Sequence, residues 1–151
     1  MKLKSILFVL FITSFLVNAA GQDSYYISKK LDVSYEKAIE RLKTELKKEG
    51  FGVVSETAMH ETINSKIPGS DMDPYVAIGA CNAKYAKKVI GLEENIGLFL
   101  PCKILVKYTS DESSEVVIIN PKVAMSVVEN KEANAIFDEV TEKLKNVLKS
   151  L

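Results

Sequence analysis

The chain has 151 residues, of which 47% are hydrophobic and 26% charged, and its 20 basic side chains balance 20 acidic ones. This composition is typical of one globular domain, and it excludes the disordered, fibrous and low-complexity classes of protein. A chain without excess positive charge is a poor candidate for nucleic-acid binding, because that function needs a concentrated basic face.

The N-terminal segment has the pattern of a secretory signal peptide. Two lysines precede an apolar run over Ile6–Val17, and small residues follow that run. The run is shorter than the ~20 apolar residues that a membrane span requires. We therefore expect residues 1–20 to be a signal peptide that is cleaved near Ala19 or Ala20. Residues 21–151 are expected to form a single domain that is periplasmic or secreted, with no stable membrane span.

The first part of the mature chain predicts a strand, a long amphipathic helix, a second strand and a short helix. Alternating residues predict the strands, and apolar residues at helical spacing predict the helices. Ser34 suits the N-cap of the long helix, and Gly50 suits the left-handed residue that ends it. In chain order these elements are Tyr25–Val33, Tyr35–Glu49, Phe51–Thr57 and His60–Lys66.

The second part of the mature chain predicts three further strands and a long final helix. The continuous apolar run Tyr75–Cys81 predicts a central strand that is buried on both faces. Asn82 suits the N-cap of a helix that follows this strand. The later elements are a hairpin formed by Ile104–Tyr108 and Val116–Ile119, a stop at Asn120–Pro121, and a helix over Glu132–Leu151.

Together these elements predict an α+β fold. Apart from the short helix over His60–Lys66, their order is β-α-β-β-α-β-β-α, and the strands follow one another in pairs. This order favours a single curved layer of about five mostly antiparallel strands over a doubly wound parallel sheet. Helices are expected to cover one face of the layer, and the longest helix is the C-terminal one.

Four short motifs resemble those of the domain-of-unknown-function family numbered 302. They are Glu49–Val53, Ile78–Asn82, Ile96–Cys102 and Asn120–Pro121, and the likeness extends from about Leu31 to Leu151. It implies a fold like half of the TATA-binding protein, with an antiparallel sheet and a long C-terminal helix. It implies no established activity, and a shared fold does not transfer DNA binding. Members usually have a proline where this chain has Ala83, and an aspartate where it has Asn120.

The two cysteines are the side chains with the clearest reactive potential. Cys81 closes an apolar strand directly before a helix N-terminus, where partial positive charge stabilises a thiolate. Cys102 opens the next strand, and antiparallel pairing would bring both sulfurs to the same edge of the sheet. Three interpretations stay open: a structural disulfide worth about 3 kcal/mol, two buried unpaired thiols, or a redox-active or soft-metal-binding pair. The resemblance favours unpaired thiols over the disulfide, because the family also occurs in proteins without an export signal.

No catalytic or metal-binding set accompanies these thiols. His60 is the single histidine, and we interpret it as a solvated residue on a short helix. No ligand spacing resembles that of a zinc site, and the Gly-x-Ser-x-Gly pattern of serine hydrolases is absent. We therefore expect no metal, no cofactor and no assembled catalytic group.

The remaining lysines and tyrosines are interpreted as surface residues. Lysine pairs at 29–30, 47–48 and 87–88 lie among acidic residues and indicate a solubilising surface. The first strand and the Tyr25–Tyr26 pair could instead serve a homodimer, since two-fold dimers are the commonest oligomers.

We interpret the chain as an exported, non-catalytic module that binds a small ligand or a protein partner. The ligand site is expected near Cys81, Asn82, Pro101 and Cys102. The second hypothesis is a thiol redox protein or thiol enzyme, with Cys81 as nucleophile and Cys102 as resolving partner. The third is an envelope structural or interaction protein whose cysteines are incidental.

Overall fold

The structure is a computed structural model, and it describes residues 24–151. The predicted signal peptide and its cleavage site therefore lie outside the described residues. The strands are β1 (Tyr26–Leu31), β2 (Gly52–Ala58), β3 (Tyr75–Cys81), β4 (Cys102–Ser110) and β5 (Ser113–Ile119). The helices are α1 (Tyr35–Lys48), α2 (Met59–Lys66), α3 (Ala83–Leu92), the 3-10 helix η1 (Glu94–Phe99), α4 (Pro121–Ala124) and α5 (Lys131–Ser150).

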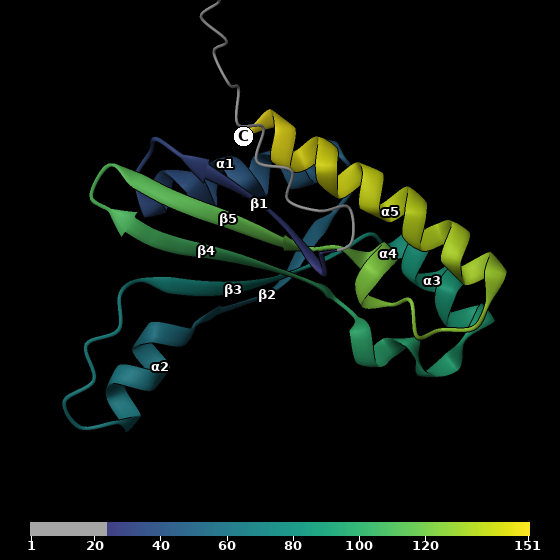
Figure 1. The fold of residues 1–151 in the computed structure, drawn as a ribbon, viewed down its shortest axis with the longest axis horizontal. Coiled ribbons are helices and arrows are strands. Elements are labelled where there is room, and N and C mark those ends of the chain that lie inside the picture. Colours follow the sequence, from purple (N-terminus) through teal and green to yellow (C-terminus); the bar gives the residue numbers. More distant parts are fainter. Residues whose placement is uncertain (1–23) are drawn as a thin grey trace, which may run out of the picture.

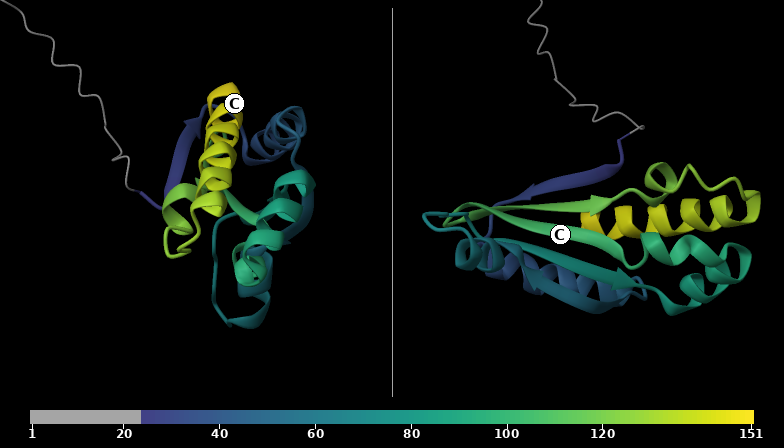
Figure 2. Two further views of the ribbon diagram at one scale, coloured as in Figure 1. Left: turned by 90° about the vertical axis from the view of Figure 1, so that its right-hand side faces the viewer. Right: turned by 90° about the horizontal axis from the view of Figure 1, so that it is seen from below.

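The five described strands form one antiparallel sheet in the order β1-β5-β4-β3-β2. Helices α1 and α5 contact each other and lie on the same face of this sheet (Figure 1). The right-hand view of Figure 2 looks onto the opposite, open face, with α5 behind the strands. The predicted α+β fold is thus confirmed: one layer of five antiparallel strands, helices on one face and a long C-terminal helix.

The core of the protein lies between the sheet and its two long helices. Successive side chains of a strand point to opposite faces, and in the three central strands β3, β4 and β5 the side chains that face the helices are buried. Burying one such Ile or Leu contributes about 1.5–3 kcal/mol relative to its exposed state. The largest of these buried side chains are Ile78, Ile104 and Ile118 from the strands, with Leu42, Leu46 and Leu144 from the helices.

The ends of α1 form as the sequence predicts. The Ser34 side chain accepts a hydrogen bond from the backbone N–H of Lys37, so it caps the first turn. Gly50 has a φ of 83°, the left-handed conformation that glycine adopts without strain. The N–H of Phe51 then bonds to the carbonyl of Leu46 at 2.9 Å, and this turn directs the chain into β2.

Burial on both faces is the one prediction for β3 that is wrong. Val76, Ile78 and Ala80 face the helices and are buried, whereas Tyr75 and Ala77 are only half-buried on the open face. Two of its open-face positions hold Tyr75 and Ala77, which tolerate partial exposure, and a third holds Gly79, which is buried. Hydrophobic character alone therefore does not reveal that this face lacks a covering element.

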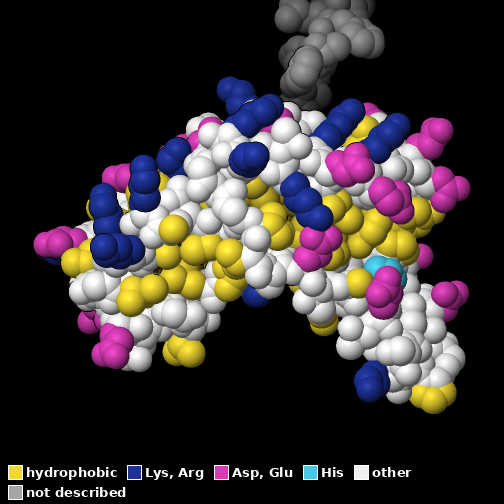
Figure 3. All heavy atoms as spheres, turned by 180° about the vertical axis from the view of Figure 1, so that it is seen from behind, with side chains coloured by type: hydrophobic (Ala, Val, Ile, Leu, Met, Phe, Trp, Pro, Cys, Tyr) yellow, Lys and Arg dark blue, Asp and Glu magenta, His cyan; other side chains and the backbone are white. Residues whose placement is uncertain are grey.

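The open face is concave. Figure 3 shows the molecule as an arch, in which α2 forms one foot and the region of α3 and η1 forms the other. Half-buried Leu105 and Val117 are paired in register on this face, next to the ion pair of Lys107 with Glu115 at 2.6 Å. Within residues 24–151, no helix combines the length and the apolar character needed to cross a membrane.

Candidate functional site

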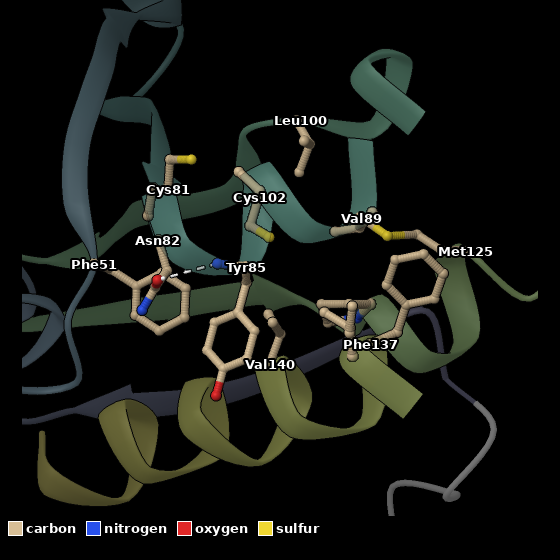
Figure 4. A pocket seen from close by; sticks show the side chains of 14 residues that line it. Phe51, Cys81, Asn82, Tyr85, Val89, Leu100, Cys102, Met125, Phe137 and Val140 are labelled. Atoms are coloured by element: carbon tan, nitrogen blue, oxygen red, sulfur yellow. Dashed lines mark hydrogen bonds between the residues drawn. The ribbon is translucent and has the colours of Figure 1, made fainter. Parts of the chain in front are cut away.

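A small apolar cavity lies at the end of the sheet where β3 and β4 approach α3, α4 and α5 (Figure 4). Its volume is about 30 Å³. That space holds roughly two water molecules or a small apolar group. The side chains that enclose it include Cys102 from β4, Tyr85 and Val89 from α3, Met125, and Phe137 and Val140 from α5.

The Cys102 thiol faces this cavity. Its residue is 5% exposed, and the pKa of the thiol is raised to about 11 from an ordinary 9.0. Burial among apolar side chains is the larger cause, and nearby Cys81, a second potential negative charge, is the smaller one. At neutral pH, Cys102 is therefore a protonated, weakly polar group that packs as a small hydrophobe.

The two cysteines lie at the same end of the sheet but on opposite faces. Cys102 is the register partner of Ala80, so these two side chains point towards the helices. Cys81 follows Ala80 in the strand and points to the open face. Figure 4 shows the sulfur of Cys81 directed away from the cavity and that of Cys102 directed into it. Both are free thiols in this structure, and their opposed directions argue against a direct disulfide.

Asn82 borders the cavity and positions α3. Its side-chain oxygen accepts hydrogen bonds from the backbone N–H groups of Lys84 at 3.2 Å and Tyr85 at 3.5 Å. This is the N-cap that the sequence predicts, formed without the proline that is usual at the next position in the resembled family. Asn82 thereby fixes where α3 begins and so where the Tyr85 side chain meets the cavity.

Pro101 lies apart from the cavity, on the open-face side of the sheet. Its ring covers Gly79, where an added Cβ would lie 2.5 Å from Cγ of Pro101 and closer still to Oγ of Ser55. The peptide between Leu100 and Pro101 is cis. Of the four residues expected at the ligand site, Asn82, Cys81 and Cys102 border the cavity, whereas Pro101 packs on Gly79.

His60 belongs to the opposite end of the molecule. Its ring nitrogen Nδ1 accepts a hydrogen bond of 3.1 Å from the backbone N–H of Tyr75, at the start of β3. Cys81 ends the same strand, roughly 20 Å away for six residues of extended chain. His60 is therefore out of reach of Cys81 and cannot act as its base. His60 is part-buried and ties α2 to the sheet, and so it is not the fully solvated residue that the sequence suggested.

No metal centre is formed by the part of the chain that the structure describes. Nowhere in residues 24–151 do three side chains of His, Cys, Asp or Glu come together as a possible ligand set.

A basic groove adjoins the apolar cavity, and sequence reasoning missed it. The groove lies between α1, α3 and α5, and it shares Asn82 and Tyr85 with the cavity. A hydrogen bond to Glu139, at the edge of this groove, raises the pKa of the Tyr85 hydroxyl. Five lysines line the groove, namely Lys48, Lys84, Lys87, Lys88 and Lys143. These lysines come from three separate segments, and only the fold brings them together.

The proposed dimer surface is open to solvent in this structure. β1 is an edge strand of the sheet. Tyr25 is 67% exposed and Tyr26 is 40% exposed, and their rings pack edge to face with centroids 5.0 Å apart. The homodimer stays a prediction.

Comparisons with known proteins agree with the fold and with the resemblance. The crystal structure of an uncharacterized conserved DUF302 protein from Bacillus stearothermophilus is similar to this chain, with a TM-score of 0.76 and 26% identity. The similarity covers 83% of this chain and 97% of that one. No curated protein matches the chain. A family model described as "Domain of unknown function DUF302" matches residues 27–151. The chain therefore belongs to the DUF302 family.

Proposed function

We propose that this protein is a non-catalytic binding module that takes a small apolar ligand, or the apolar end of a longer one, into the cavity beside Cys102. The observation that carries this proposal is the lining of the cavity, which is almost wholly apolar and closed by three helices. Small-molecule sites are usually lined by apolar and aromatic side chains with a few polar groups, and this cavity has such a lining although it is much smaller. The exported location that the N-terminal sequence predicts is part of the same proposal.

The size of the cavity limits what it binds. The side chains that line an empty apolar cavity have no atoms to contact inside it. An apolar ligand that enters the cavity therefore adds dispersion contacts with these side chains. The best small ligands gain at most about 1.5 kcal/mol per non-hydrogen atom. A fragment of about two carbon atoms, which matches the space of roughly two water molecules, therefore gains at most about 3 kcal/mol and binds in the millimolar range. Tighter binding requires further contacts outside the cavity.

The thiol-based hypothesis has less support. A redox pair or a nucleophile with a resolving partner needs one ionised thiol and a second thiol within reach. The raised pKa keeps Cys102 protonated, and Cys81 points to the other face of the sheet. No histidine lies near either cysteine, because His60 is at the far end of β3. An interaction module of the cell envelope is compatible with the fold, but no contact in the structure favours it over ligand binding.

Titration with hexan-1-ol, a short uncharged amphiphile, tests the proposal. Backbone amide NMR should show saturable shifts confined to α3, α5 and the start of β4. Ala86→Leu places a larger side chain in the cavity, so it should abolish these shifts while the protein stays folded. Ala77→Leu makes the same change on the open face and should leave binding intact. Shifts scattered over the surface, or unchanged binding to the Ala86 variant, would contradict the proposal.

A further inference from the structure

The apolar cavity and the basic groove are two compartments of one continuous surface. Asn82 and Tyr85 line both of them. In Figure 4 the ring of Tyr85 stands between Phe51 and Val140, with its hydroxyl pointing away from Cys102. A molecule with its apolar end in the cavity would therefore pass Tyr85 and Asn82 and place its other end in the groove.

The charge of the groove indicates which chemical group the other end of the ligand carries. Five lysines line the groove, against the two glutamates Glu49 and Glu139. Glu49 pairs with Lys143 at 3.1 Å, and Lys48 pairs with Glu45 at 2.6 Å. The three lysines of α3 make no ion pair with any residue in the described part of the chain; they are Lys84, Lys87 and Lys88, and all three are exposed.

The placement of these lysines departs from the usual charge pattern of a helix. Helices favour acidic residues in the first turn, where the backbone carries partial positive charge, and basic residues in the last turn. α1 follows that rule, with Glu36 at its start and Lys47 and Lys48 at its end. α3 has no acidic residue in its first turn, and Lys84 occupies that turn instead. Such a departure adds nothing to the stability of the helix, and it is expected where a surface serves a ligand.

We propose that the ligand of the cavity is an amphipathic anion, whose short apolar end lies beside Cys102 and whose carboxylate or phosphate lies among the lysines of α3. This inference rests on the proposed function and names its ligand class. The head group contacts lysine side chains rather than the backbone, because the backbone N–H groups of Lys84 and Tyr85 already donate hydrogen bonds to the side-chain oxygen of Asn82. These contacts outside the cavity supply the affinity that its small volume cannot.

Matched probes with the same six-carbon chain test the inference. Hexan-1-ol, hexanoate and hexyl phosphate are titrated into the full mature protein, and each dissociation constant is measured by NMR. Hexanoate or hexyl phosphate should bind about tenfold more tightly than hexan-1-ol, since several weak, screened ion pairs add up. That advantage should shrink as the salt concentration rises. The stronger of the two anions identifies the head group as a carboxylate or a phosphate.

Two triple variants with the same net charge distinguish an effect of the groove lysines from an effect of the net charge of the protein. The triple variant Lys84→Gln, Lys87→Gln and Lys88→Gln should lose the tenfold advantage of the anion and bind hexan-1-ol as before. The control is Lys30→Gln, Lys66→Gln and Lys103→Gln, which removes three exposed lysines on β1, α2 and β4 and should change neither affinity.

The outcomes distinguish this inference from the proposed function. If hexan-1-ol binds in the cavity but both anions bind no better, the amphipathic anion is wrong and the apolar site stands. Equal weakening by both triple variants overturns the inference too, because the effect is then that of net charge. If none of the three probes binds, both the proposed function and the amphipathic anion are wrong.

Discussion

The two faces of the sheet use the same strands for different purposes. On the helix-covered face, Ile104 and Cys102 are sealed among apolar side chains. Leu105 follows Ile104 in β4, and Cys81 follows Ala80, the register partner of Cys102; both face the concave open side. Because side chains alternate between the two faces, a shift of one position along a strand moves a side chain from the packed core to a half-exposed surface. The comparison teaches that the two cysteines, which look like a pair in the sequence, belong to different environments.

Truncation of two neighbouring residues in β4 should show the largest difference in stability between the two faces. Ile104→Ala should cost about 3 kcal/mol of unfolding free energy, because it leaves a cavity in a fully buried site. Leu105→Ala should cost about 1 kcal/mol, because its half-buried side chain already contacts solvent. Urea denaturation of both variants measures the difference, and equal losses would mean that the open face is covered in solution.

The alkaline stability of the protein should depend on Cys102. Below pH 9 the thiol is protonated in both folded and unfolded chains, and between pH 9 and about 11 only the unfolded chain ionises. Stability conferred by the buried neutral thiol is therefore lost as the pH rises through this window, by about 2–3 kcal/mol. Cys102→Val should remove this part of the loss, as measured by urea denaturation at pH 8 and pH 10.5. Cys81→Ala serves as the control: it removes only the smaller of the two causes that raise the Cys102 pKa, so it should keep most of the wild-type slope.

The contact of Gly79 with Pro101 gives the open face its own packing requirement. Gly79→Ala should destabilise the protein by about 1–3 kcal/mol, because the added methyl group meets the Pro101 ring and the Ser55 hydroxyl. Gly91→Ala, in the last turns of α3 with open space around it, should be neutral or slightly stabilising. Thermal unfolding compares the two, and a harmless Gly79 variant would show that Pro101 moves freely.

The smallest effect is expected from the ion pair on the open face. The hydrogen bond from Lys107 holds the pKa of Glu115 below its ordinary value of 4.5, with further help from Ser28. The pair therefore stabilises the folded state above pH 4.5, and that contribution is lost as the pH falls through the lowered pKa. Glu115→Gln should flatten the acid limb of the stability curve by less than about 1 kcal/mol, because solvent screens the pair. An unchanged acid limb would show that the pair contributes nothing measurable.

Much of the fold follows from local patterns. Ser34 and Gly50 mark the two ends of α1, and Asn82 marks the start of α3, because capping depends on residues only a few positions apart. The order of the elements also favours the antiparallel arrangement. Its most local part is the hairpin of β4 and β5, which a short turn joins. Family motifs supported the same architecture.

The candidate site is less predictable, since it depends on register and on long-range packing. The pairing of Ala80 with Cys102 decides that the sulfurs point apart, and no pattern within either strand contains that register. Tyr85, Val89 and Phe137 have the helical spacing of ordinary core residues, and only the meeting of α3 with α5 makes them walls of a cavity. The lysines of the groove are likewise brought together by the fold.

Alkylation of the two cysteines tests the central claim most directly. The native protein is treated with iodoacetamide, with and without hexan-1-ol, and the modification of each residue is followed by mass spectrometry. Cys81 should react at the same rate in both samples. Cys102 should react more slowly than Cys81, and saturating ligand should slow it several-fold further by holding the cavity closed. Equal reaction of both thiols, or no protection of Cys102 by the ligand, would contradict the account.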